Sequence, residues 1–225
     1  MIMKILPAVT TITPKAWKDK IKEVKELKLK EVYLFPTCLK QKERKELYET
    51  IEKTSIERIP FVHLRSDMEL WELDYLTENY KTKVFNTHSQ KEYPLANNLD
   101  KYKDFIYIEN TYAPLDEEEI KEFAGICLDF SHLENDRVFH PEKYRHNVSL
   151  IEKCSAGCNH ISAVKPSKEA SVLEYDNHYL KDLSELDYLK KYPLKYFSQY
   201  IAIELENTIE QQLEAIAYIK KNILT

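Results

Sequence analysis

Six successive apolar, β-branched or aromatic segments of this 225-residue chain end in an imidazole or a carboxylate. These end residues are His63, His88, Glu109, Asp129 with His132, His160, and Glu204. Imidazole nitrogens and carboxylate oxygens are ligands for zinc, manganese and iron, and a mixture of both suits a site with several metals. A single histidine at such a position is usually structural. Four of the seven histidines are placed this way, where about one is expected by chance, so the pattern predicts a metal centre.

Two further features add candidates to this set. Asp176-Asn-His178 offers a carboxylate and an imidazole two residues apart, in a polar segment that follows the seventh apolar run. Glu204 and Glu206 alternate on the last run and therefore face opposite sides of a strand. Glu204 is the preferred ligand because the apolar sequence YIAI leads directly into it, and Glu206 is the alternative.

The elements that must position these residues are eight short runs typical of β-strands. They cover residues 4–10, 31–36, 59–64, 83–87, 105–109, 125–130, 159–164 and 200–205. The charged segments between them have helical period, as Trp17, Ile21, Val24 and Leu27 show in the first. Strands that alternate with helices indicate βα units and a parallel sheet. An open doubly wound sheet would share this alternation.

Polar residues concentrated at the strand ends favour closure of the sheet over the open form. A (β/α)8 TIM barrel gathers the carboxyl ends of its strands into one mouth, where ligands far apart in sequence converge. We therefore predict an α/β fold, a single TIM-barrel domain over residues 1–225. Gly125 and Gly157 precede strands six and seven and are expected to be helix C-caps. The long segments 132–146 and 165–179 are expected to build the substrate site.

Composition excludes several classes of function. The only two glycines cannot form a P-loop or a dinucleotide-binding fingerprint. A net charge of −5 argues against a generally basic nucleic-acid-binding surface, although a local basic rim could still attract phosphate. No run approaches the roughly 18 apolar residues that span a bilayer, and the N-terminus resembles a first strand more than a signal peptide. We expect a soluble, cytoplasmic protein without a membrane partner.

Seven short motifs together resemble a known superfamily. In chain order they are FVHL, NTHS, IYIENT, CLDFSH, NHISAVK, EYDNH and IAIELEN. They look like the successive metal motifs of the xylose-isomerase-like TIM barrels, which include sugar phosphate isomerases and epimerases and AP endonuclease family 2. The closest likeness is to the endonuclease IV branch, and it spans the third to the eighth strand.

The resemblance implies a cluster of up to three zinc ions; manganese or iron would accept the same ligands. One metal would take His63, His88 and Glu109. A second would share Glu109 and take Asp129, His160 and Glu204. The third would take His132, Asp176 and His178. Lys165 keeps its place in the NHISAVK motif and would approach an anion of the substrate.

The chemistry implied is hydrolysis of a phosphoester by metal-activated hydroxide, with Glu109 positioning a pair of metals. Damaged DNA is the substrate of the endonuclease IV branch, but the first two strands, ending in VTTI and FPTC, lack that branch's recognition-loop sequences. The alternative is a metal-dependent sugar or sugar-phosphate isomerase or epimerase, in which Glu109 and Glu204 would shuttle a proton between adjacent carbons. A third possibility is a binding or regulatory module that has kept its ligands.

Overall fold

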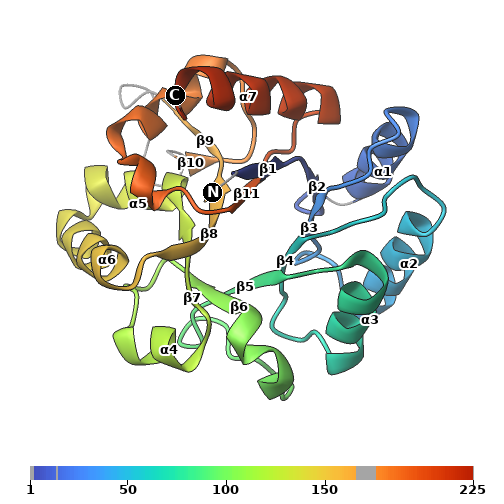
Figure 1. Cartoon of the computed structure of the whole chain (residues 1–225), viewed down its shortest axis with the longest axis horizontal. Coiled ribbons are helices and arrows are strands. Elements are labelled where there is room, and N and C mark those ends of the chain that lie inside the picture. The colour runs from blue at the N-terminus through green and yellow to red at the C-terminus, as the bar shows by residue number, and fades with distance from the viewer. Residues whose placement is uncertain (1–2, 14, 166–175, 225) are drawn as a thin grey trace.

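A computed structural model describes residues 3–13, 15–165 and 176–224, and nine of its strands form one parallel sheet. In sheet order they are β1 (Lys4–Leu6), β11 (Tyr200–Ile203), β8 (Ala156–Ile161), β7 (Gly125–Asp129), β6 (Ile106–Glu109), β5 (Val84–His88), β4 (Phe61–His63), β3 (Tyr33–Phe35) and β2 (Ala8–Thr10). Each predicted strand segment contributes to it, and the sheet curls into the predicted (β/α)8 barrel (Figure 1). Two short strands, β9 (Ala163–Val164) and β10 (Asp176–Asn177), pair antiparallel outside it.

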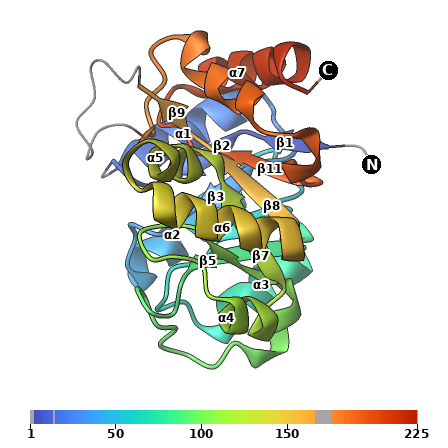
Figure 2. The same ribbon diagram turned by 90° about the vertical axis from the view of Figure 1, so that its left-hand side faces the viewer.

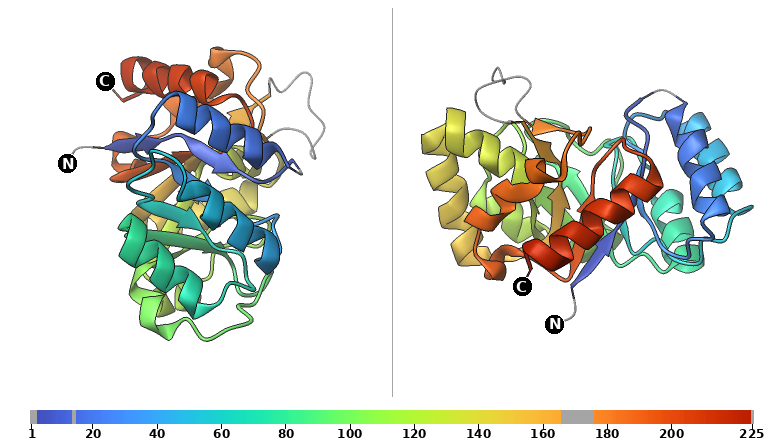
Figure 3. Two further views of the ribbon diagram at one scale, coloured as in Figure 1. Left: turned by 90° about the vertical axis from the view of Figure 1, so that its right-hand side faces the viewer. Right: turned by 90° about the horizontal axis from the view of Figure 1, so that it is seen from above.

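Helices surround the strands as an outer ring (Figure 1). They are α1 (Ala16–Glu26), α2 (Gln41–Ile51), α3 (Leu70–Tyr80), α4 (Glu117–Glu122), α5 (Phe130–Phe139), α6 (Pro141–Cys154) and α7 (Ile209–Asn222). Short 3-10 helices stand between β5 and β6 (Asp100–Phe105) and before β11 (Leu183–Lys191 and Leu194–Tyr196). In the left panel of Figure 3, α1, α2 and α3 follow one another along one flank of the barrel.

The barrel closes through its first strand, which Pro7 interrupts. Residues on one side of Pro7 pair with β11 and those on the other side pair with β3. Proline has no N–H to donate to a sheet, so the break falls where a ladder hydrogen bond would be lost. Gln212 of α7 bridges the gap: its Oε1 accepts from the Ala8 N–H at 2.6 Å, and its Nε2 donates to the Leu205 carbonyl at 2.8 Å. A side chain of α7 thus supplies hydrogen bonds that β2 and β11 do not make with each other.

Alternation along each strand separates the core from the site. On β6, Ile106 and Ile108 pack outward under the helices, whereas Tyr107 and Glu109 face the barrel interior. The interior is filled by a cluster of Leu6, Ala8, Tyr33, Phe35, Phe61, Val84, Cys127, Cys158 and Ala202. On four of the strands, the inward position two residues after a member of this cluster is a predicted ligand. The potential ligands therefore form a polar layer on top of an apolar one.

The two glycines do not cap helices, so that prediction is wrong. Gly125 begins β7, Gly157 lies within β8, and the C-cap residues of the helices before them are Phe123 and Ser155. A Cβ on Gly157 would lie 2.0 Å from Cε1 of Tyr107. The missing side chain instead leaves room for the Tyr107 ring inside the barrel.

The two ends of the barrel differ. The strand β1 begins near one end, and α5, which directly follows β7, lies at the opposite end with β9 (Figure 2). The strands therefore finish at the end marked by α5. Among the helices of residues 3–13, 15–165 and 176–224, none has the length and apolar character needed to cross a membrane.

Candidate metal centre

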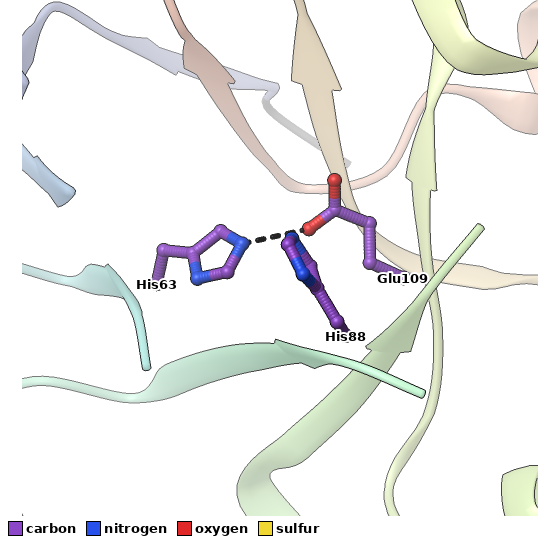
Figure 4. Close-up of side chains that lie close together, drawn as sticks. All are labelled: His63, His88 and Glu109. Atoms are coloured by element: carbon purple, nitrogen blue, oxygen red, sulfur yellow. Dashed lines mark ion pairs between the residues drawn. The ribbon is translucent and has the colours of Figure 1, made fainter. Parts of the chain in front are cut away.

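Three potential ligands meet where β4, β5 and β6 end. His63, His88 and Glu109 point toward one another from these strand ends (Figure 4), and one ligand atom of each lies within 4.8 Å of the others. Nε2 of His63 is 3.0 Å from Oε2 of Glu109. The rings of His63 and His88 meet edge to face with centroids 4.9 Å apart. These are the residues predicted for the first metal.

A second set lies beside the first and shares Glu109. Nδ1 of His160 is 3.4 Å from Oε2 of Glu109 and 3.2 Å from Oε1 of Glu204. Asp129, His160 and Glu204 again bring one ligand atom each within 4.8 Å of one another. All four side chains are almost fully buried. The geometry therefore gathers the residues predicted for the second metal.

The residues predicted for a third metal are only partly gathered. His132 joins a group with Glu109 and Asp129, and its Nδ1 lies 2.7 Å from Oδ2 of Asp176. His178 is not in any of the groups of three found among the described residues. Its Nδ1 donates to the Glu204 carbonyl at 3.0 Å, which fixes the ring near the others and leaves Nε2 with its lone pair.

The remaining candidates occupy different surroundings. Glu206 accepts a hydrogen bond from the Thr13 N–H at 2.7 Å, away from the ligand layer, whereas Glu204 lies within that layer. Lys165 directly follows β9 and is partly exposed. Residues 166–175 of the expected substrate segment lie outside the described part of the chain.

Buried atoms without partners test whether the site fits a metal. Among the described residues, six buried side-chain polar atoms lack a hydrogen bond: one each in Thr77, Asn86 and Asn135, and the three atoms His63 Nε2, His160 Nδ1 and Asp129 Oδ2 at the site. Buried polar atoms in proteins are nearly always bonded, so unpaired ones need an explanation such as an ion. All three belong to predicted ligands, and all three face neighbouring ligands. The donor set therefore fits divalent cations.

Hydrogen bonds behind two histidines select the ring nitrogen left for a metal. Nδ1 of His63 donates to the Leu64 carbonyl at 2.9 Å, which leaves Nε2 facing Glu109. Nε2 of His160 is 3.0 Å from the hydroxyl of Tyr33, which leaves Nδ1 facing Glu109 and Glu204. Metal-binding histidines usually donate their other N–H in this manner.

Charge inside the site is balanced by protons in the metal-free protein. Burial lowers the pKa of His160, but Glu204 and Glu109 outweigh it and raise that pKa to about 10. For His132 burial is likewise outweighed, by Asp129 and Asp176, and the pKa is about 10. Burial opposes ionisation of Glu109, yet His160 and His63 hold its pKa well below the usual value. For His88 burial dominates and lowers the pKa to about 4, so its ring is neutral. A cation could replace the two imidazolium protons without leaving the carboxylates unpaired.

Two supporting residues were missed by the sequence-based prediction. The Tyr33 hydroxyl donates to Oε1 of Glu204 at 2.6 Å, in addition to its contact with His160. Nδ2 of Asn86 donates to Oε2 of Glu109 at 2.7 Å. Alternation along the strand could have placed Asn86 inward, two residues before His88. No pattern in the sequence indicates that Tyr33 of β3 contacts Glu204, which follows β11.

Comparisons with known proteins agree with this architecture. No protein-family profile and no curated protein matches the sequence. Among solved structures, the IolI protein with a bound zinc atom is similar with a TM-score of 0.52 and 13% identity, over 99% of this chain and 98% of that one. The probable 3-DHS dehydratase AsbF of Bacillus anthracis gives a TM-score of 0.48 and 11% identity, over 98% and 99%. Endonuclease IV from Thermus thermophilus gives 0.46 and 13%, over 96% and 98%. The chain therefore has a TIM-barrel fold similar to that of the IolI protein.

Proposed function

We propose that the protein is a metal-dependent hydrolase that binds two or more divalent ions, with zinc as the first candidate, and cleaves a phosphoester. The observation that carries this proposal is the position of Glu109, which belongs to three of the four ligand groups. A carboxylate has two oxygens and can serve two adjacent metals. His63 and His88 would then hold one ion, and Asp129, His160 and Glu204 would hold the other.

Divalent ions bound here supply Lewis acidity, which lowers the pKa of water and stabilises a departing oxygen. The chain's own residues orient the reaction. Glu109 and Asp129 are held by hydrogen bonds, from Asn86 to the first and from the Ser131 and His132 amides to the second, so neither carboxylate has to reorganise. Burial of these carboxylates excludes bulk water from the floor of the site and strengthens their field.

A sugar or sugar-phosphate isomerase or epimerase is the second candidate, and one observation favours it. His178 is absent from the ligand groups of the described residues, whereas those groups contain Glu109, Asp129, His132, His160 and Glu204, the subset that resembles the ligands of the sugar isomerases and epimerases. Glu109 and Glu204 flank His160 at 3.4 and 3.2 Å. Two carboxylates so placed could take a proton from one substrate carbon and return it to the next.

Metal content and activity on simple probes separate the two candidates. Protein purified without chelators or an affinity tag is analysed for metals and assayed with bis(4-nitrophenyl) phosphate. The hydrolase predicts at least two metals per chain and phosphodiester cleavage that falls with the loss of one metal in His88→Ala. Glu210→Ala, which removes an exposed carboxylate at the start of α7, is the control and should change neither.

One metal per chain, no cleavage of the diester, and exchange of sugar-phosphate carbon hydrogen with deuterated water would overturn the hydrolase in favour of the isomerase. Absence of metal after incubation with zinc, manganese or iron would overturn both. His178→Ala adds a finer comparison. It lowers the metal count only if a third ion is bound.

Tyr33→Phe is expected to weaken metal binding about 10- to 100-fold, the usual effect of losing a group that orients ligands. Phenylalanine fills the same space, but His160 loses its acceptor and Glu204 its donor. Affinity is measured by competition with a chromophoric chelator. Tyr107→Phe alters another interior tyrosine and should leave affinity unchanged. Equal affinities in Tyr33→Phe and the wild type would show that the hydroxyl does not position these ligands.

A further inference from the structure

A cavity of about 280 Å³ opens beside His63 and His88, at the ends of β4 and β5. Its lining consists of the two histidines with Thr37, Leu64, Arg65, Ser66, Thr87 and Tyr93. The volume is at the lower limit for ligand pockets. It therefore suits one functional group of a substrate and a few attached carbons better than a whole nucleotide.

Charge in this cavity is of one sign. Among the described residues that line it, Arg65 alone is permanently charged, and Thr37, Ser66, Thr87 and Tyr93 add hydroxyl groups that can donate hydrogen bonds. The tyrosine ring stands against His88 with centroids 5.2 Å apart and is 49% exposed. The Arg65 guanidinium and the hydroxyl groups can donate hydrogen bonds to an oxyanion, and the Tyr93 ring can pack against a short carbon skeleton.

The guanidinium of Arg65 is held in place before any ligand arrives. Its Nε lies 2.9 Å from Oδ1 of Asp67, and its Nη1 donates to the Thr37 carbonyl at 2.9 Å. Within residues 3–13, 15–165 and 176–224, no partner is found for its Nη2 group. A fixed fork loses little entropy when it binds a carboxylate or a phosphate.

The ion pair with Asp67 orients the Arg65 side chain, because Asp67 is itself fixed by a second arginine. Nη1 of the buried Arg44 lies 2.9 Å from the same Oδ1 atom. Arg44 also binds Glu72, so Asp67 belongs to a network of two arginines and two carboxylates that holds the Arg65 guanidinium in one orientation. The side chain of Arg65 keeps 34% of its surface exposed.

We propose that this cavity is an oxyanion subsite in which Arg65 binds a carboxylate or phosphate group of the substrate, while the reacting atoms lie at the metal centre beside His63 and His88. The inference rests on the proposed function for the location of the reaction, and it names the substrate class as a small molecule that carries an anionic group. Arg65 is thus a substrate-binding residue in addition to the predicted Lys165.

Binding of two simple anions to metal-loaded protein tests this assignment. Inorganic phosphate and malonate are titrated calorimetrically into the wild type, Arg65→Met, Arg65→Lys and the control Arg145→Met, whose arginine lies on α6 with 68% of its side chain exposed. Arg65→Met should weaken binding of at least one anion tenfold or more, with a smaller loss in Arg65→Lys, which keeps the charge but not the fork. Arg145→Met should bind as the wild type does.

Each outcome distinguishes among the alternatives. A loss confined to phosphate assigns the subsite to a phosphorylated substrate, and a loss confined to malonate assigns it to a carboxylate. Equal affinities in the wild type and Arg65→Met, with equal melting temperatures and metal content, would overturn the subsite while leaving the proposed function intact. If the protein takes up no metal, the proposed function fails, and the same titration of metal-free protein still tests Arg65.

Discussion

Replacing Glu109 by glutamine is expected to remove at least one metal from each chain and to abolish most activity. The carboxylate belongs to three ligand groups and lies close to both His63 and His160. An amide keeps the size but offers one neutral acceptor in place of two charged oxygens. Metal affinity should fall by more than the roughly 10- to 100-fold that outer-shell partners contribute. Elemental analysis gives the count directly.

Thermal stability provides a second readout that does not depend on substrate. A ligand that binds only the folded state stabilises it by about 2.7 kcal/mol at 100 times its Kd. Added zinc should therefore raise the melting temperature of the wild type and raise that of Glu109→Gln far less. Glu206→Gln alters a carboxylate outside the ligand layer and should behave as the wild type. A full metal complement and an undiminished zinc effect in Glu109→Gln would refute the shared-ligand geometry.

The largest effect on stability is expected from Arg44→Met. Arg44 of α2 is fully buried and binds Glu72 of α3 through two bonds of 2.7 Å, and Tyr48 donates to the same carboxylate at 2.9 Å. Removing the arginine leaves a buried carboxylate without its cation, which typically costs about 3–5 kcal/mol. Chemical denaturation of the metal-free protein measures the change.

A double variant shows whether the loss of stability in Arg44→Met comes from the unpaired Glu72 carboxylate. Arg44→Met combined with Glu72→Leu removes both charges and should recover much of the lost stability, since apolar pairs often replace buried ion pairs without penalty. Lys18→Met breaks an exposed ion pair with Glu46 and should cost less than about 1 kcal/mol. If Arg44→Met were no worse than Lys18→Met, the network would not hold α2 to α3.

The sequence predicted the fold, and it indicated which candidate ligands lie in one layer, because both depend on period-two alternation. A candidate ligand such as His160 lies in register with the apolar residues of its strand, so its place in the barrel mouth follows from its position in the sequence. The break at Pro7 and the role of Gln212 could not be predicted in this way, because they depend on which side chain of a distant helix meets an unpaired N–H. Residues remote in sequence also decide which ligands meet, and the third predicted ligand set is gathered only in part for this reason.

Helix ends and cavities were predicted less well. Glycine often ends a helix, but Gly157 leaves space for the Tyr107 ring inside the barrel. That requirement is visible only in the folded structure, where β6 and β8 lie close together. Arg65 was not singled out because one arginine in a polar loop has no distinguishing local pattern. Its significance depends on Asp67, Arg44 and the cavity beside His88.

The break at Pro7 has a consequence for biosynthesis. Ala8 and Gln212 are 204 residues apart, so the barrel cannot close until the last helix has left the ribosome. At about 5–20 residues per second, the first strand waits roughly 10–40 s for its partner. During that interval the growing sheet has two open edges, each able to pair with another nascent chain. Production of this protein should therefore benefit from slow expression and from chaperones that shield strand edges.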